Sequence, residues 1–292
     1  MVLSKTFLCV RFVAVLSTDR NLLYSIAGLA MRHYFKVVSI LLALLVSTSF
    51  ANGETPPEAQ EAFLQLKKQI EAHYFSYDEG AHRQLLGRAN GFVKHYPEAW
   101  HAHYYAALIN IQLGNIVRAD RKAEAYRYYH SALRHAQSAH EIAGNAETTV
   151  VLAAAYGKLA SLRTLKMFYF GAKSKNTMIE AFKMNDHSPK SHLIIGVHTM
   201  WTPTVFGGSN DTAREFLEKA LALGLDWSEN DPLVVRWATS PEILAHLAQL
   251  EIFCGAPERA WDYVNAVMAL VPQYGFVTRD ILPQLNETEA GG

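Results

Sequence analysis

Cysteine is scarce in this chain: its 292 residues contain only two, Cys9 and Cys254. If the N-terminal region is removed, Cys254 stands alone and no disulfide can form within the remainder. Runs of Lys and Arg are missing as well, and the formal net charge is zero. A nucleic-acid partner is therefore not indicated, because such proteins carry a basic stripe or patch.

Long hydrophobic runs are also absent, and the longest near the N-terminus is the ten-residue stretch Val37–Val46, interrupted only by Ser39. This length is too short for a permanent membrane-spanning helix. It follows the basic segment 31–36 and precedes the small residues Ser49 and Ala51, which suit a cleavage site. The pattern predicts a secretory signal peptide. No cysteine follows the run, so a lipid anchor is not indicated.

The signal lies unusually far from the first residue. We interpret residues 1–30 as an overrun of the start site, with Met31 as the true initiator. The alternatives are a very long n-region, or a first apolar patch at 7–16 that touches the membrane. The predicted division is 1–30 (overrun or extended n-region), 31–51 (signal peptide) and 52–292 (a single helical domain). Without residues 1–51 the chain holds 22 basic and 26 acidic residues, a mildly acidic balance.

Sustained strand alternation is missing from the rest of the chain, whereas apolar residues recur at helical spacing, which predicts an all-α protein. Pro and Gly mark the helix boundaries. We expect a short helix over Pro232–Thr239 and a frayed tail after Pro283. The principal predicted helices cover about 57–74, 85–96, 100–113, 117–142, 147–162, 166–184, 190–201, 209–224, 241–254 and 257–271.

The stretch Lys190–Gly224 illustrates the unit from which the chain is built. It reads as a helix, a break at Thr202–Gly208 and a second helix with Ser209 as its N-cap. In the second helix, Ala213, Leu217 and Ala220 share one face. Gly196 in the first helix leaves room for a partner helix. Such a two-helix unit cannot bury its apolar face alone, so we expect copies of it along the chain.

The last hairpin resembles the tetratricopeptide repeat (TPR) in residue type and spacing. Its signature positions are held by Leu244, Leu247, Ala248, Gly255, Ala260, Val264, Val267 and Pro272. The position of Val267 is held upstream by Ala132, Ala181 and Ala220, at intervals of 49, 39 and 47 residues. A regular TPR repeats every 34 residues. The resemblance, which covers roughly 57–272, therefore implies a degenerate TPR-like array of about five antiparallel helix hairpins with lengthened turns.

The break between Pro203 and Gly208, followed by a helix rich in Ala and Leu, resembles exported bacterial TPR-like proteins. Among them is the periplasmic T-component family of TRAP transporters. That resemblance implies a periplasmic location, a solute-binding protein as partner and a channel for a hydrophobic small ligand. The chain departs from the family in having no lipid-anchor cysteine after its apolar run.

Catalytic motifs are missing, so we expect no enzyme activity, no catalytic residues and no cofactor. The histidines have poor metal-binding spacing: His101 and His103 point to different faces of a helix, and His130 and His135 are five residues apart. We interpret them as scattered surface or helix-facing imidazoles, with a weak periplasmic zinc site as the alternative. A metal-dependent enzyme remains a minor alternative function.

Aromatic residues are the best candidates for binding. They cluster on two predicted helices and flank the break, where they either fill the gaps of lengthened helices or line a groove, as helical arrays commonly do. We therefore expect an exported, non-catalytic TPR-like binding or scaffold protein that offers an aromatic-lined groove to a protein partner. The alternative is a transport accessory with an apolar ligand. The candidate binding residues are Trp201, Pro203, Phe206, Gly207, Gly208, Tyr126, Tyr129 and Phe168.

Overall fold

A computed structural model describes residues 55–162 and 165–290. These residues form eleven α-helices, two short 3-10 turns and one π turn, and no strand occurs within the described ranges. The predicted all-α class is thereby confirmed. The predicted start-site overrun and signal peptide lie outside the described residues. No helix in the described part is long and apolar enough to cross a membrane.

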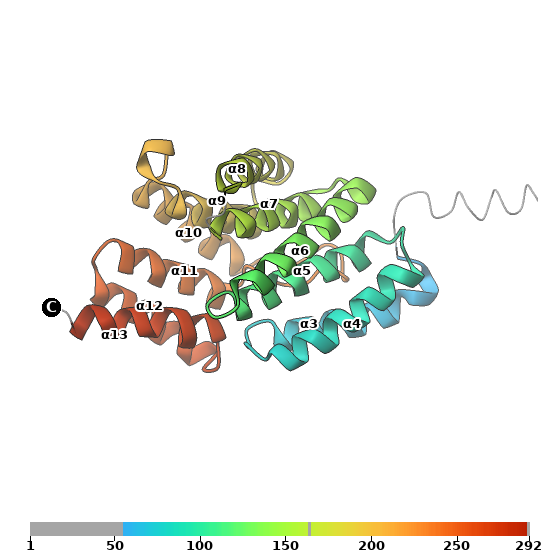
Figure 1. Ribbon diagram of the computed structural model, residues 1–292, viewed down its shortest axis with the longest axis horizontal. Helices are drawn as coiled ribbons and strands as arrows, with labels where there is room; N and C mark the ends of the chain where they lie inside the picture. Colours follow the sequence, from blue (N-terminus) through green and yellow to red (C-terminus); the bar gives the residue numbers. More distant parts are fainter. Residues whose placement is uncertain (1–54, 163–164, 291–292) are drawn as a thin grey trace, which may run out of the picture. The chain divides into compact units, whose positions relative to one another are not determined.

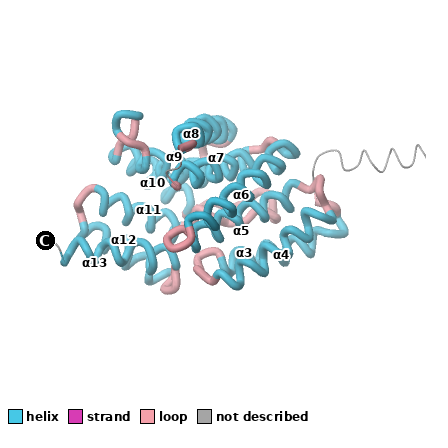
Figure 2. The backbone as a smooth tube through the Cα atoms, in the orientation of Figure 1, coloured by secondary structure: helices cyan, strands magenta, loops and turns pink. Residues whose placement is uncertain are grey.

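The helices pack as consecutive antiparallel pairs, and each pair also packs on the next (Figures 1 and 2). This arrangement confirms the predicted array of about five hairpins. A 3-10 turn, Pro57–Ala59, precedes the first pair. The pairs are α3 (Gln60–His73) with α4 (Glu79–His95), α5 (Trp100–Val117) with α6 (Lys122–Ala143), α7 (Ala146–Ser161) with α8 (Met167–Met184), α9 (Pro189–Trp201) with α10 (Asn210–Gly224), and α11 (Ser240–Phe253) with α12 (Pro257–Leu270).

Small residues hold the second helix of each pair close to the first. Ala132, Ala181, Ala220 and Val267 are fully buried in α6, α8, α10 and α12, so the repeated position read from the sequence is a repeated packing position. Helix starts are fixed locally: the side chains of Asp78, Asn145 and Ser209 each accept a hydrogen bond from the backbone N–H three residues on. Such caps contribute about 1 kcal/mol each.

The α9–α10 hairpin shows why the small residues are needed. A Cβ atom on Gly196 would lie 2.8 Å from Leu217 Cγ and 3.2 Å from the carbonyl oxygen of Ala213. The first distance is shorter than Cβ contacts in proteins and the second is at the tight end of their range, so a glycine at residue 196 allows the two helices to approach this closely. Ala213, Leu217 and Ala220 are fully buried against α9, as predicted.

The first helices of the last four pairs, α5, α7, α9 and α11, are buried on most sides, whereas α3 and the second helices are amphipathic. In α5, all but three of the 18 residues are buried. One side of these helices packs on the second helices, and consecutive first helices also contact one another. The remaining side, which we call the inner face, is covered by a stretch of the chain itself.

That stretch is the connection between α10 and α11, residues 226–239, which we call the inner segment. The predicted short helix over Pro232–Thr239 is wrong, because these residues adopt an irregular path of turns and bends. Leu233, Val234, Val235 and Trp237 are nevertheless buried. They belong to the same core cluster as the first helices, so burial of their side chains in tertiary contacts outweighs the local preference for a helical turn.

The C-terminal tail is also ordered, contrary to the predicted fraying. A π turn, Val277–Ile281, runs into α13 (Leu282–Ala290), and the side chains of Val277, Ile281 and Leu285 are buried. The reason is a contact with the first hairpin. The backbone N–H of Gly275 donates to the carbonyl oxygen of Phe75 at 2.8 Å.

Further contacts join the tail to the start of the array. The rings of Phe75 and Tyr274 lie 4.8 Å apart, and the Tyr77 hydroxyl donates to Asp280 at 3.2 Å. Asp280 also pairs with Arg118 at 3.0 Å. Figure 1 shows this junction, where α12 and α13 lie beside the α3–α4 turn. The C-terminal tail of the array thus packs against its first hairpin.

Candidate functional site

The break between α9 and α10 forms a compact turn rather than a loose loop. After Pro203, residues Thr204–Phe206 make a single 3-10 turn, and the backbone N–H of Gly208 donates to the carbonyl oxygen of Pro203 at 3.2 Å. Gly207 has a φ of +91°, a conformation that side chains disfavour. A Cβ atom on Gly208 would collide with the carbonyl group of Thr202. The two glycines therefore shape the turn.

Two aromatic residues at this turn are more than half exposed: Trp201 ends α9, and Phe206 lies in the turn itself. Trp201 is 51% exposed and Phe206 58% exposed. Phe168, at the start of α8, is 62% exposed, and its ring lies 5.7 Å from that of Phe206. Trp201 lies 4.8 Å from Phe253, at the end of α11, with the rings edge to face. The structure therefore brings three of the candidate residues to one side of the array.

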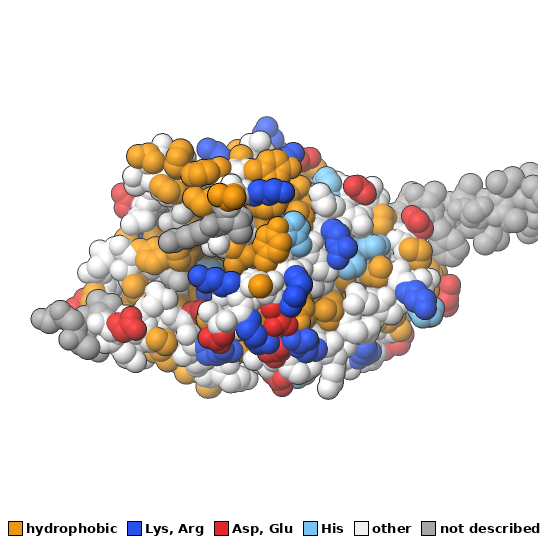
Figure 3. All heavy atoms as spheres, viewed as in Figure 1, with side chains coloured by type: hydrophobic (Ala, Val, Ile, Leu, Met, Phe, Trp, Pro, Cys, Tyr) orange, Lys and Arg blue, Asp and Glu red, His pale blue; other side chains and the backbone are white. Residues whose placement is uncertain are grey.

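These side chains come from three consecutive hairpin turns, α7–α8, α9–α10 and α11–α12. We call this surface the aromatic edge. Figure 3 shows a gathering of hydrophobic side chains over the same elements. Exposed apolar side chains are ordinary when they are scattered, but a contiguous group of this kind is typical of an interaction surface. The members of the aromatic edge are Leu165, Phe168, Tyr169, Trp201, Val205, Phe206 and Phe253.

Tyr126, at the start of α6, extends the apolar surface. It lines a shallow hollow together with Lys122, Ala123, Leu162, Leu165 and Lys166. Its ring lies 4.4 Å from that of His130, which in turn lies 5.9 Å from Phe170. Burial, and then the charges of Lys166 and Arg134, lower the pKa of His130. The hollow is thus lined by apolar and basic side chains together.

Tyr129 does not take part in this surface. It is fully buried between α5 and α6, where its ring covers Gly114 and its hydroxyl donates to Asn115 Oδ1 at 2.9 Å. Burial raises its pKa. Sequence reasoning grouped Tyr129 with Tyr126 because both fall in one aromatic cluster, but the structure separates them into a packing residue and a surface residue.

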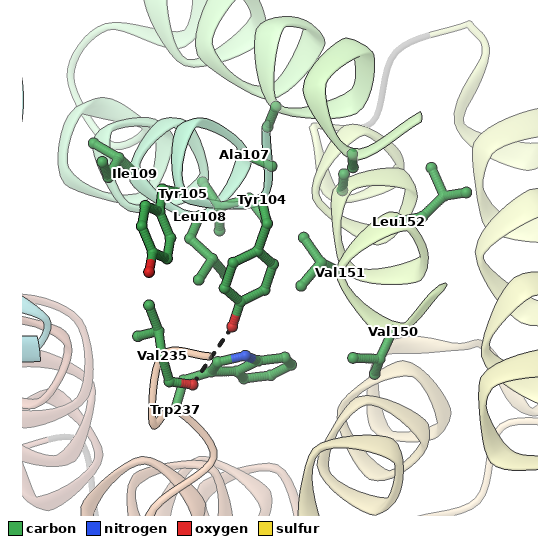
Figure 4. Close-up of a cluster of buried hydrophobic side chains, with 14 of the residues drawn as sticks. Tyr104, Tyr105, Ala107, Leu108, Ile109, Val150, Val151, Leu152, Val235 and Trp237 are labelled. Atoms are coloured by element: carbon green, nitrogen blue, oxygen red, sulfur yellow. Dashed lines mark hydrogen bonds between the residues drawn. The ribbon is translucent and has the colours of Figure 1, made fainter. Parts of the chain in front are cut away.

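The inner face is the place where helical arrays commonly form a groove, so the expected groove or channel would run there. Here the inner segment occupies it. The hydroxyl of Tyr105 donates to the carbonyl oxygen of Leu233 at 2.6 Å, and that of Tyr104 lies 3.4 Å from the carbonyl oxygen of Val235. Figure 4 shows both tyrosines pointing from α5 at the inner segment. The main chain of this segment is therefore held as a bound peptide would be.

A buried ion pair anchors the same segment. Lys190, at the start of α9, has a side chain that is 1% exposed, and its Nζ lies 2.8 Å from a carboxylate oxygen of both Glu147 and Glu229. It also donates to the carbonyl oxygen of Val235 at 3.2 Å. Glu147 accepts two more hydrogen bonds, from Tyr104 Oη at 2.7 Å and Trp237 Nε1 at 3.1 Å. Sequence reasoning missed this cluster, whose members are spread over residues 104–237.

Helices of the first, second and last pairs also form hydrogen bonds with the inner segment. Glu71 of α3 accepts from the backbone N–H of Arg236 at 2.7 Å, and Glu242 of α11 accepts from that of Ala238 at 2.9 Å. His101 of α5 lies 2.8 Å from Asp231. The first helix of every pair thus contacts residues 226–239. Seven of the twelve large hydrophobic side chains that are exposed in the described part belong to the aromatic edge instead.

The described residues contain no group of three or more His, Cys, Asp or Glu side chains that could hold a metal ion. The one cysteine among them, Cys254, is exposed, and Arg214 Nη2 lies 3.6 Å from its sulfur. The polar clusters found in the described part, including the buried one around Lys190, consist of ion pairs and hydrogen bonds that join helices.

Comparison with known proteins supports the fold. No protein-family model matches the sequence. A search of curated proteins likewise gives no match. Among solved structures, the chain is similar to TTC0263, a thermophilic TPR protein of Thermus thermophilus, with 19% identity, a TM-score of 0.55, and coverage of 80% of this chain and 98% of that one. It is also similar to the HusA haemophore of Porphyromonas gingivalis, with 19% identity, a TM-score of 0.54, and coverage of 68% and 92%.

The chain has a TPR-like helical fold. At this level of identity the similarity concerns the fold alone, because unrelated functions share common folds. It agrees with the repeat pattern read from the last hairpin and with the packed helix pairs of the structure. What the TPR-like array binds has to be argued from its own surface.

Proposed function

We propose that this chain is an exported, non-catalytic scaffold that binds a protein partner through the aromatic edge. The observation that carries the proposal is the exposure of Phe168, Trp201 and Phe206 on consecutive hairpin turns. Aromatic side chains supply much of the binding energy in protein interfaces. The filled inner face leaves this edge as the apolar surface within reach of a partner.

The charge around the aromatic edge defines the chemistry of the partner. Lys122, Lys166, Lys173 and Lys175 are exposed beside it. Residues 165–175, which carry part of the edge, contain three basic and no acidic residues. A partner segment with apolar or aromatic anchors flanked by Asp or Glu fits this surface, because rim charges of opposite sign speed association and favour the correct partner.

The predicted signal peptide motivates a periplasmic location. The resemblance to T-component proteins motivates a solute-binding protein as the partner at the edge. The channel that the resemblance implies is less well supported, because the inner segment packs where a channel along the first helices would run. As the alternative function we therefore propose a transport accessory that binds a solute-binding protein, without a ligand channel along the first helices.

Site-specific crosslinking in the native host tests the scaffold function. A photoreactive phenylalanine analogue replaces Phe168 or Phe206 and, as the matched control, Leu270, which is 59% exposed at the end of α12. We expect a discrete crosslinked protein from the two edge positions and none from residue 270. A solute-binding protein in that band would support the transport role. Equal crosslinking at all three positions, or none at either edge position, would contradict the proposal.

A second candidate function is the capture of an apolar, anionic small ligand in the hollow beside Tyr126. The apolar lining and the positive charges of Lys122 and Lys166 favour it. One structure of similar fold is a haemophore, which makes haem a suitable probe. Titration with haem should give a shifted absorption band that weakens in Tyr126→Ala and Lys166→Ala. An unshifted band, or one that both variants leave unchanged, would argue against the hollow as the ligand site.

A further inference from the structure

Two histidines that are 32 residues apart meet across the α5–α6 hairpin. The Nδ1 atoms of His103 and His135 lie 3.3 Å apart, and the ring centroids are separated by 5.6 Å. Both side chains are partly exposed. The sequence gives no hint of this pairing, because each histidine belongs to a different helix and neither has a partner at helical spacing.

The tautomer of His103 is fixed by its second ring nitrogen. Nε2 lies 3.0 Å from the carbonyl oxygen of Pro97, which can only accept, so Nε2 carries the proton. In the neutral ring, Nδ1 of His103 then carries the lone pair, and it faces His135. A metal-binding histidine typically donates its other ring N–H to a carbonyl or carboxylate group, which fixes the ring orientation.

The spacing between the two nitrogens matches a metal chelate. Two nitrogens that are each about 2.05 Å from a zinc ion, and 3.3 Å from one another, subtend about 107° at the metal, close to the tetrahedral angle. The main alternative is a simple hydrogen bond in which His135 Nδ1–H donates to His103. In a chelate, the proton of His135 would reside on Nε2 instead.

The pair is accessible from solvent, because both imidazoles are partly exposed. The positive charge of exposed Arg134, on the same helix as His135, opposes a cation and weakens the site. No further His, Cys, Asp or Glu of the described part completes a three-residue group, so two coordination positions stay open to water.

We propose that His103 and His135 form a two-imidazole site for a borderline divalent transition-metal ion such as Zn²⁺, bound through both Nδ1 atoms and completed by water. Imidazole suits this class of metal, whereas Ca²⁺ and Mg²⁺ prefer oxygen ligands. With only two protein ligands, the site binds more weakly than a structural zinc site. It also bridges the two helices of one hairpin, so occupancy stabilises their packing.

Calorimetric titration of the untagged full-length chain with ZnCl₂ tests the site. We expect saturable binding that weakens at least tenfold in His103→Ala and in His135→Ala, a factor typical of disturbed metal sites. His187→Ala is the matched control, because His187 is exposed in the α8–α9 turn, where its Nδ1 lies 2.7 Å from Asp186. The control should bind as the wild type does. CaCl₂ and MgCl₂ should give no saturable heat.

Nitrogen-15 spectra of the histidine rings give a second readout that needs no substitution. Zinc should shift the Nδ1 signals of His103 and His135 together, while Nε2–H of His103 stays protonated. If the wild type binds no zinc, the pair is only hydrogen-bonded and the proposal is wrong. It is also wrong if zinc shifts other histidines instead, or if both alanine variants bind as tightly as the wild type.

Discussion

Replacing Lys190 by methionine should destabilise the protein severely. The substitution keeps the length of the side chain but leaves the carboxylates of Glu147 and Glu229, each within 2.8 Å of the lysine nitrogen, without their cation. Both carboxylates are largely buried, with side chains 15% and 12% exposed. Removing one partner from a buried ion pair typically costs about 3–5 kcal/mol, because a charge is left uncompensated. We expect a loss in that range at pH 7.

Urea unfolding, followed by far-ultraviolet circular dichroism, measures this loss. The matched control is Lys183→Met, on the exposed surface of α8, which should change stability by less than about 0.5 kcal/mol. The triple change that adds Glu147→Gln and Glu229→Gln should recover part of the loss, because it removes the stranded charges. In the single variant, protonation of either stranded carboxylate removes an uncompensated buried charge, so stability should partly return as the pH is lowered from 7 to 5.

Trypsin cleavage tests whether the stability lost in Lys190→Met comes from release of the inner segment. Arg236 is an exposed trypsin site, but its neighbours in the inner segment are buried and its backbone N–H is hydrogen-bonded to Glu71. Loss of Lys190 should free the segment and accelerate cleavage after Arg236. If Lys190→Met costs less than about 1 kcal/mol and leaves this cleavage rate unchanged, the ion pair does not anchor the segment and our reasoning about the inner face fails.

Two further predictions concern acid stability and closure of the array. Burial, then the charges of Lys158 and Arg118, lower the pKa of His246 to about 3 in the folded state. Between about pH 6.5 and pH 3, the unfolded chain therefore binds a proton on this histidine and the folded chain does not. Stability should therefore fall from pH 6.5 toward pH 3, and pH-dependent urea unfolding should show a shallower slope in His246→Phe; an unchanged slope would contradict this origin. A Cβ atom on Gly275 would collide with the ring of Tyr77, so Gly275→Ala should cost about 1–3 kcal/mol in thermal unfolding. Gly171→Ala, where nothing lies near the added atom, should instead gain up to about 1 kcal/mol, and equal effects of the two changes would refute the closing contact.

The repeated helix pairs could be predicted from the sequence because their contacts are local and periodic. Ala132, Ala181, Ala220 and Val267 stand at the same point of successive second helices, and small side chains are needed there for close packing. Gly196 could be assigned a packing role for the same reason. These positions depend on neighbours within a single hairpin, which the helical period of the sequence reveals.

The inner segment could not be predicted, because its conformation depends on partners far away in the sequence. A proline followed by Leu233, Val234 and Val235 suits the first turn of a helix. In the structure, these residues are held by side chains of α5 and α9, such as Tyr105 and Lys190. Tyr129 was misassigned for a related reason: the rotation of α6, which is set by α5, decides which tyrosine faces outward.

The lengthened repeats explain why the inner face is closed while an outer edge is exposed. A regular repeat leaves no spare residues between hairpins, but here two stretches interrupt the pattern. Residues 226–239, between α10 and α11, cross the first helices and fill the inner face. The turn at 202–208 instead points outward, and it presents Phe206 beside Phe168. The two stretches therefore act in opposite ways: the first removes the usual groove from use, and the second supplies an apolar surface at the hairpin turns.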